Sequence, residues 1–226
     1  MTKLKKKVVV IGAGHNALTC ASYLAKSGFE VEVHESRSEV GGMACTREFT
    51  EGYKVPGVAH LLHMLNPNIQ KWLGLNKNGL EFAANRLKTI SLNPNGNALV
   101  IDGDHLKGDG ITEKHQAEFK SFKKKTNSLA QFFRSTYQIS PPRIRTDNKK
   151  DLLGLMQTGW NLRTMGSEGM TDMLRFIAIN VFDLFDEYFD NDFIKGSLAI
   201  DAVLGNHLGP RTNNSVITYL HTLTGE

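Results

Sequence analysis

One short segment near the N-terminus constrains the fold of this chain more than any other. Val8–Ile11 is a run of β-branched residues that ends at a glycine, which is typical of a buried parallel strand. Asn16–Ser27 carries apolar residues at helical spacing and stops before Gly28, and Phe29–His34 has the composition of a second strand. A strand, a glycine turn, a helix and a second strand in this order predict one βαβ unit with a right-handed crossover.

The same segment begins with lysines and valines, as a secretory leader does. The apolar region of such a leader is a continuous block. Here the apolar run stops at Ile11, and Gly12–Asn16 then brings in two glycines and two polar side chains. No later stretch has the length of a membrane-spanning helix. We therefore expect residues 1–35 to belong to the mature structure and the protein to be cytoplasmic.

Length and charge narrow the classes of function. A chain of 226 residues can form one or two domains with a real core, and its composition is typical of a soluble globular protein. The net charge is only +4, much of it in Lys3–Lys7 and Lys120–Lys125, and no nucleic-acid-binding motif is present, so we expect no nucleic-acid partner. Cys20 and Cys45 form no C-x-x-C pair, which argues against a redox-active dithiol and favours two small packed thiols.

The turn between the first strand and the helix carries a dinucleotide-binding fingerprint. Gly12, Gly14 and Ala17 have G-x-G-x-x-A spacing in the required strand–turn–helix context. Gly12 allows the tight turn, Gly14 lets the backbone approach a pyrophosphate, and Ala17 permits close packing of the helix on the strand. The pyrophosphate would bind free amide groups at the helix N-terminus. Glu35 is placed to accept hydrogen bonds from ribose hydroxyls and would repel a 2′-phosphate, which argues against NADP.

The rest of the chain has a different pattern, and five stretches predict further elements. These are a short helix after Gly41-Gly42, a hairpin of Leu87–Leu92 with Ala98–Ile101, a helix over Thr112–Thr136, several helices over 151–205 broken near 166–169 and 190–192, and a last helix over Asn214–Leu223. We therefore expect a dinucleotide-binding segment over residues 1–75. A hairpin and a mostly helical region should follow over residues 76–226.

Only two parallel strands are predicted, and a two-stranded parallel sheet is not a stable unit by itself. The remaining strands must come from sequence outside these residues, from a partner, or from later strands that the pattern hides. We expect the chain to be the N-terminal part of a longer protein, and an oligomer is a second way to complete the sheet.

The residues that follow Glu35 help to separate FAD from NAD. Glu35–Thr46, ESRSEVGGMACT, contains the pair Gly41-Gly42, where backbone can approach a ligand without hindrance from a Cβ atom. This segment resembles the double-glycine segment of FAD-dependent oxidoreductases of the phytoene desaturase and flavin amine oxidase type. The resemblance continues in Gly52–Pro67, GYKVPGVAHLLHMLNP, and in Asp201–Gly225.

The resemblance implies an α/β Rossmann-like FAD/NAD(P)-binding fold of the glutathione-reductase-like kind, incomplete here, with a mostly helical substrate-side region. It implies FAD as the cofactor, with its pyrophosphate at the glycine turn, its adenosine ribose at Glu35 and its adenosine half near Arg37. The implied FAD contacts fall into three groups: Gly12, Ala13, Gly14, His15, Asn16 and Ala17; Glu35, Ser36 and Arg37; and Gly41, Gly42, Met43 and Ala44.

The activity that the resemblance implies is hydride transfer from an apolar or polyene-like small molecule to the flavin. Two alternatives are a flavin-dependent isomerase without net redox change and a truncated, non-catalytic protein with an FAD fold. Three departures from the family pattern bear on this choice: Ala17 in place of a glycine, Pro56 where desaturases often have an acidic residue, and the absence of the late glycine-rich segment that closes the flavin site. No catalytic acid or base is identified, because His60 and His63 are better interpreted as packed histidines.

Two further patterns are better explained by structure than by binding. Lys120–Phe133 combines lysines with aromatic residues at helical spacing; docking on an anionic membrane is one interpretation, and a helix packing its aromatic stripe on the core is favoured. Asp183–Asp192 is acidic but lacks the glycine and terminal glutamate of a calcium loop. We expect no metal site there, and a helix followed by an N-cap at Asp190 or Asp192.

Overall fold

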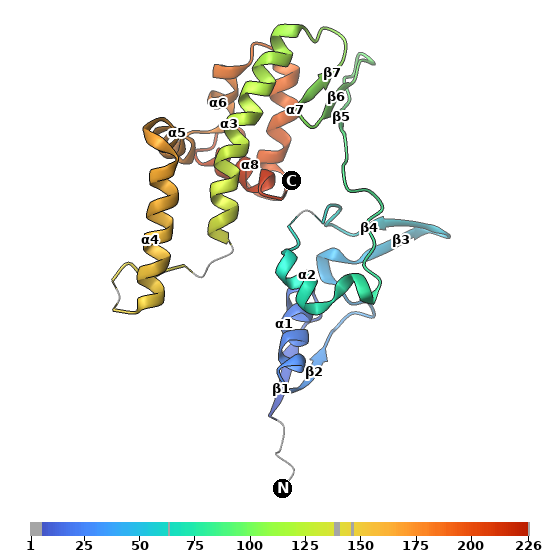
Figure 1. Cartoon of the computed structure of the whole chain (residues 1–226). Coiled ribbons are helices and arrows are strands. Elements are labelled where there is room, and N and C mark those ends of the chain that lie inside the picture. Colours follow the sequence, from blue (N-terminus) through green and yellow to red (C-terminus); the bar gives the residue numbers. More distant parts are fainter. Residues whose placement is uncertain (1–5, 63, 138–140, 146, 226) are drawn as a thin grey trace. The chain divides into compact units, whose positions relative to one another are not determined.

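The chain divides into two compact units, residues 1–83 and residues 84–226. A computed structural model describes residues 6–62, 64–137, 141–145 and 147–225 (Figure 1). We propose that the units correspond to the expected dinucleotide-binding and substrate-side regions, with the boundary moved from residue 75 to residue 83.

The first unit begins with the βαβ unit that the sequence predicts. Strand β1 (Lys7–Ile11) pairs in parallel with β2 (Glu30–His34), and helix α1 (His15–Lys26) connects them. The register runs from Lys7 opposite Glu30 to Ile11 opposite His34. Gly28 has a φ of +91°, a left-handed conformation that returns the chain from α1 to β2 at little steric cost. The predicted strand–helix–strand order is confirmed.

The remaining elements of the first unit follow the double-glycine segment. The 3₁₀ helix η1 (Gly42–Ala44) confirms the expected short helix, and β3 (Thr46–Thr50) and β4 (Tyr53–Pro56) form an antiparallel hairpin. The sequence did not predict this hairpin, because every residue in it is exposed and no alternation of apolar and polar residues marks a buried face. Helix α2 (Pro67–Leu73) and the 3₁₀ helix η2 (Leu75–Asn78) complete the unit.

The first unit buries little apolar surface. Among its described residues, Ala13 and Ala21 are the only buried hydrophobic residues. Val9 and Ile11 of β1 are 52% and 82% exposed, so one face of the two-stranded sheet has no apolar cover. The described part of the chain thus holds the two parallel strands that were expected, and this sheet needs further surface to form a core.

The second unit begins with a three-stranded antiparallel sheet. Strands β5 (Thr89–Ser91), β6 (Leu99–Asp102) and β7 (His105–Lys107) pair in chain order. The pair β5–β6 confirms the predicted hairpin. Strand β7 was not predicted because it is only three residues long and follows a two-residue turn.

Six helices follow in the described part of the second unit. They are α3 (Glu113–Tyr137), α4 (Lys149–Thr164), α5 (Gly166–Ala178), α6 (Val181–Tyr188), α7 (Asp192–Val203) and α8 (Ser215–Leu223). The long helix α3 and the last helix α8 match the predicted elements.

The breaks between these helices follow local chemistry. The break between α4 and α5 lies where it was expected, because Gly166 has a φ of +74°, although α5 continues through Gly169. A break at Asn180, whose side chain caps α6, was not expected. The expectation of an N-cap at Asp190 or Asp192 is wrong: the amide oxygen of Asn191 accepts the N–H groups of Phe193 and Ile194 at the start of α7.

The core of the second unit is aromatic and centres on α3. Phe122 is fully buried and lies with its ring centroid 5.1–5.9 Å from the rings of Phe185, Tyr188, Phe189 and Tyr219. Offset and edge-on contacts of this kind stabilise a core beyond the area they bury. The aromatic stripe of Lys120–Phe133 therefore packs inward, as the favoured interpretation predicted.

Among the described residues, no helix combines the length and the apolar character needed to cross a membrane.

Candidate functional site

The glycine turn after β1 leaves the start of α1 open to a ligand. Gly12 has a φ of +92°, and its N–H donates to the carbonyl of His34 at 2.6 Å, which fixes the turn against the end of β2. Gly14 is the N-cap of α1 in extended conformation; no side chain caps the helix, and its first turn has no acidic residue. Because the first N–H groups of a helix have no partner within the helix, this end of α1 can accept an anion.

The double-glycine segment comes back against this turn. The N–H of Gly41 donates to the carbonyl of Ala13 at 2.8 Å, and Gly14 and Gly41 form an isolated parallel bridge. A Cβ atom at Gly42 would lie 3.1 Å from the Cα of Gly14, and Gly42 has a φ of +61°. The two glycine segments therefore touch backbone to backbone, and a side chain at Gly42 would separate them.

Glu35 ties the end of β2 to the glycine turn. Its carboxylate accepts the N–H of Ala13 at 2.7 Å through Oε2 and the N–H of Arg37 at 3.0 Å through Oε1. The hydrogen bond from Ala13, followed by that from Arg37, lowers the pKa of Glu35 below its usual 4.5. A carboxylate has further lone pairs, so it can still accept from a ribose hydroxyl.

A pocket of about 530 Å³ lies beside these residues. It is lined by Glu35, Arg37, Ser38, Glu39, Gly42, Met43, Cys45 and Arg47. Four of them, Ser38, Glu39, Cys45 and Arg47, are absent from the residues that sequence reasoning selected. Cys45 and Arg47 are alternate residues of the extended stretch that follows η1, and this spacing is the sequence signal that could have found them, since alternate residues of an extended segment face one side.

The structure brings the three predicted groups together only in part. Glu35, Arg37, Gly42 and Met43 share the pocket, and Ala13, Gly14 and Gly41 form the backbone contacts beside it. The other predicted residues lie outside the pocket lining: the half-buried Gly12 and Ala17, together with His15, Asn16, Ser36 and Ala44, which are exposed. These assignments remain predictions, with Gly12 and Ala17 acting through the shape of the turn and the packing of α1.

Four other sequence expectations concern single side chains. His60 is exposed, so its interpretation as a packed histidine is wrong, and His63 lies outside the described residues. Cys20 is exposed on α1, so the expectation of a packed thiol fails there, whereas Cys45 is half-buried. Both cysteines are free.

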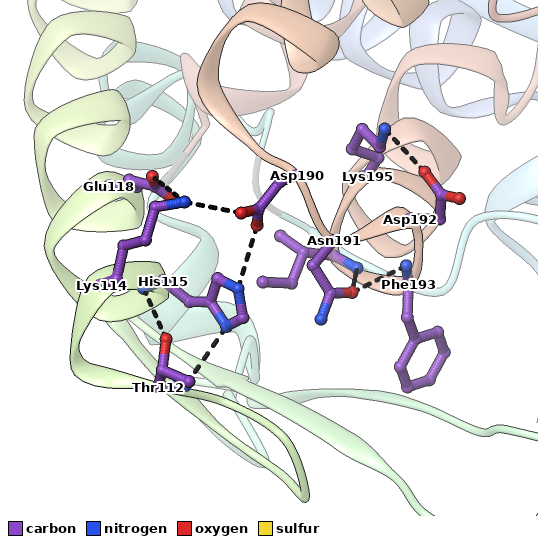
Figure 2. Close-up of polar contacts among 10 residues, drawn as sticks. Thr112, Lys114, His115, Glu118, Asp190, Asn191, Asp192, Phe193 and Lys195 are labelled. Atoms are coloured by element: carbon purple, nitrogen blue, oxygen red, sulfur yellow. Dashed lines mark hydrogen bonds and ion pairs between the residues drawn. The ribbon is translucent and has the colours of Figure 1, made fainter.

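The second unit holds a polar cluster around Asp190 and His115 (Figure 2). The Nδ1 atom of His115 accepts the N–H of Thr112 at 3.2 Å, so Nε2 carries the proton that is donated to Asp190 at 3.1 Å. Lys114 binds the same carboxylate at 2.6 Å and, above all by this hydrogen bond, lowers the pKa of Asp190. Both ring nitrogens of His115 are thus occupied, and the cluster joins the start of α3 to the α6–α7 connection. Its role is structural.

No group of three or more His, Cys, Asp or Glu side chains suited to a metal ion occurs among residues 6–62, 64–137, 141–145 and 147–225.

The chain is similar to known proteins in ways that match this geometry. The NAD(P)-binding Rossmann-like domain family matches residues 10–74. The rat (Rattus norvegicus) pyridine nucleotide-disulfide oxidoreductase domain-containing protein 2 is 27% identical over 96% of this chain, which spans 40% of the length of that relative.

Two further relatives match shorter parts. One of the polypeptides of limonene dehydrogenase from Castellaniella defragrans is 37% identical over 46% of this chain and 19% of its own length. The flavin-dependent L-tryptophan oxidase RebO of Lentzea aerocolonigenes is 43% identical over 26% of this chain and 12% of its own length.

A structure of putrescine oxidase bound to putrescine has the same fold, with a TM-score of 0.54 at 17% identity, over 96% of this chain and 41% of that one. These comparisons confirm the resemblance that the double-glycine segment indicated and the Rossmann-like fold that the βαβ unit predicted. Residues 10–74 of this chain match the NAD(P)-binding Rossmann-like domain family, and the chain is similar over 96% of its length to pyridine nucleotide-disulfide oxidoreductase domain-containing protein 2.

Proposed function

We propose that this chain binds FAD and forms the cofactor-binding part of an oxidoreductase that moves a hydride from an apolar small molecule to the flavin. One observation carries the proposal: the backbone of Gly42 meets that of Gly14 beside the uncapped start of α1, with Glu35 at the end of β2. This arrangement offers amide groups to a pyrophosphate and a carboxylate to a ribose.

The choice of FAD over NAD is supported by the double-glycine segment and by a relative. A glycine turn with an acidic residue suits either dinucleotide, whereas the Gly41-Gly42 segment is the part that resembles FAD-dependent oxidoreductases. The relative with 43% identity over part of this chain is a flavin-dependent oxidase. The Glu35 carboxylate disfavours the 2′-phosphate of NADP by charge repulsion.

The residues of the site have distinct roles in this proposal. The N–H groups at the start of α1 would bind the diphosphate, Glu35 would bind the adenosine ribose, and Gly42 would leave room for the cofactor to pass close to the backbone. Bound FAD would supply the hydride acceptor. The described residues of this chain give no acid or base with a geometry for proton transfer, and we assign none.

An apolar substrate is supported by the similarity to the limonene dehydrogenase polypeptide, since limonene is a hydrocarbon. Val9 and Ile11 leave an apolar face of β1 exposed, which supports a need for further polypeptide to cover it. Additional polypeptide, from sequence outside these residues or from a partner, would cover this face in the active protein.

The test is retention of FAD by the chain. The protein is incubated with excess FAD and desalted, and its visible absorption spectrum is recorded beside that of two glycine variants. At Gly14 a Cβ atom would meet no protein atom within 4 Å, so Gly14→Ala should fold but place a methyl group where the cofactor must approach. Gly159→Ala, on helix α4, also meets nothing within 4 Å and serves as the matched control.

We expect wild type and Gly159→Ala to keep a flavin spectrum and Gly14→Ala to lose most of it. A wild-type chain that remains colourless at saturating FAD would contradict the proposal for this chain. Equal retention by all three proteins would show that flavin binds elsewhere.

A further inference from the structure

Arg47 reaches the cofactor pocket although it lies beyond the double-glycine segment. It is on β3, two residues after Cys45, and both side chains line the pocket with Met43. Gly57 makes this placement feasible: a Cβ atom there would lie 3.3 Å from Nε of Arg47 and 3.1 Å from Sγ of Cys45. The N–H of Gly57 donates to the carbonyl of Cys45 at 2.8 Å, which holds the glycine backbone against the residue that precedes β3.

The charges of the pocket favour an anion at Arg47. Arg37 and Arg47 both line it, and neither forms an ion pair with any carboxylate in the described part of the chain. Glu35 lines the same pocket, but backbone amides already bind its carboxylate. Glu39 is the remaining carboxylate of the lining, and no ion pair joins it to either arginine. Two arginines therefore line this pocket, and neither is paired with a carboxylate among the described residues.

We propose that Arg47 is a cofactor-binding residue that contacts the diphosphate of the dinucleotide. This inference rests on the proposed function and adds a residue that neither the glycine fingerprint nor the double-glycine segment contains. A guanidinium suits the contact because its planar set of N–H groups can donate two parallel hydrogen bonds to phosphate oxygens. Gly57 leaves room beside this arginine, since a Cβ atom there would lie 3.0 Å from the carbonyl oxygen of Cys45 and 3.3 Å from Nε of Arg47.

The test compares ligands that differ in phosphate content. Binding of FAD, ADP and adenosine to the whole chain is measured by isothermal titration calorimetry for wild type, Arg47→Gln and Arg47→Lys. Arg47→Gln removes charge-assisted hydrogen bonds at an exposed site and should weaken FAD and ADP binding about tenfold, which corresponds to about 1.4 kcal/mol. Adenosine binding should stay unchanged. Arg47→Lys should bind FAD and ADP more tightly than Arg47→Gln but less tightly than wild type, because lysine keeps the positive charge without the planar set of N–H donors.

A matched control is Lys54→Gln, which removes an exposed cation from β4 of the same hairpin but outside the pocket lining. It should bind all three ligands as wild type does, and circular dichroism checks that each variant is folded. Glu39→Gln should bind ADP more tightly than wild type, because it removes a carboxylate that faces the same pocket.

The outcomes separate this inference from the proposed function. If wild type binds FAD and ADP and Arg47→Gln binds them equally well, the inference is overturned while the proposed function stands. If Arg47→Gln weakens adenosine as much as ADP, the contact is not to phosphate and the inference is overturned. If wild type binds neither FAD nor ADP, both fail, because Arg47 then has no cofactor to bind.

Discussion

Replacing Gly42 by alanine tests whether the contact between the two glycine segments builds the site. The added methyl group would lie 3.1 Å from the Cα of Gly14, whereas non-bonded carbon atoms rest about 3.5 to 4.0 Å apart. The backbones of Gly14 and Gly42 must therefore separate by about half an ångström. The bridge between Gly14 and Gly41 and the hydrogen bond from Gly41 to Ala13 lie in the path of that movement.

Two effects of this substitution can be separated with a matched control. Gly42 has a φ of +61°, and an L-residue in this left-handed conformation is less stable by about 1 to 2 kcal/mol whatever surrounds it. Gly74, at the end of α2, has a φ of +65°, and a Cβ atom there would meet only Nδ2 of Asn78 at 3.8 Å. Gly74→Ala therefore carries the same conformational strain without the clash.

The assay measures amide hydrogen exchange at Gly41 and the affinity for FAD in both variants. Gly42→Ala should speed exchange at Gly41 and weaken FAD about tenfold, which corresponds to the loss of about one hydrogen bond at roughly 1.4 kcal/mol. Gly74→Ala should leave both quantities as in wild type. Equal effects of the two substitutions would refute the reasoning, because strain alone would then explain the result.

Three further predictions concern single side chains. Phe122→Ala, at the centre of the aromatic core, should lower the free energy of unfolding by about 3 to 5 kcal/mol in urea denaturation, whereas Ile90→Ala, at a side chain that is 60% exposed, should change it by less than about 0.5 kcal/mol. The pKa of Glu35 in the folded protein lies below 4.5. The ionised carboxylate therefore contributes its full stabilisation above pH 4.5, and this stabilisation is lost as the pH falls through the folded pKa. The amide resonance of Ala13 should therefore titrate below pH 4.5 in wild type and stay flat in Glu35→Gln. Asp190→Asn should lower the thermal midpoint at low ionic strength and have little effect in about 1 M salt, because the ion pair with Lys114 is exposed. A deficit that persists in high salt would contradict this account of Asp190.

The βαβ unit could be predicted from the sequence because its information is local. The β-branched run before Gly12, the helical spacing after Asn16 and the stop at Gly28 each act within a few residues, and β1, α1 and β2 follow that order. The long helix α3 could also be predicted, from its helical periodicity, and the β5–β6 hairpin could be predicted from the strong turn signal between its strands. The hairpin β3–β4 escaped prediction because its residues are all exposed and no core imposes a pattern on them.

The sequence by itself thus determined the glycine turn, Glu35 and the double-glycine segment as the parts of a dinucleotide site. Only the tertiary structure decided how they meet: that Gly42 touches Gly14, that Glu35 accepts the amide of Ala13, and that Gly57 leaves space for Arg47 in the pocket. The physical reason is range. Turn conformation and helix capping depend on neighbouring residues, whereas the approach of two backbones and the convergence of two arginines depend on segments that only folding brings together.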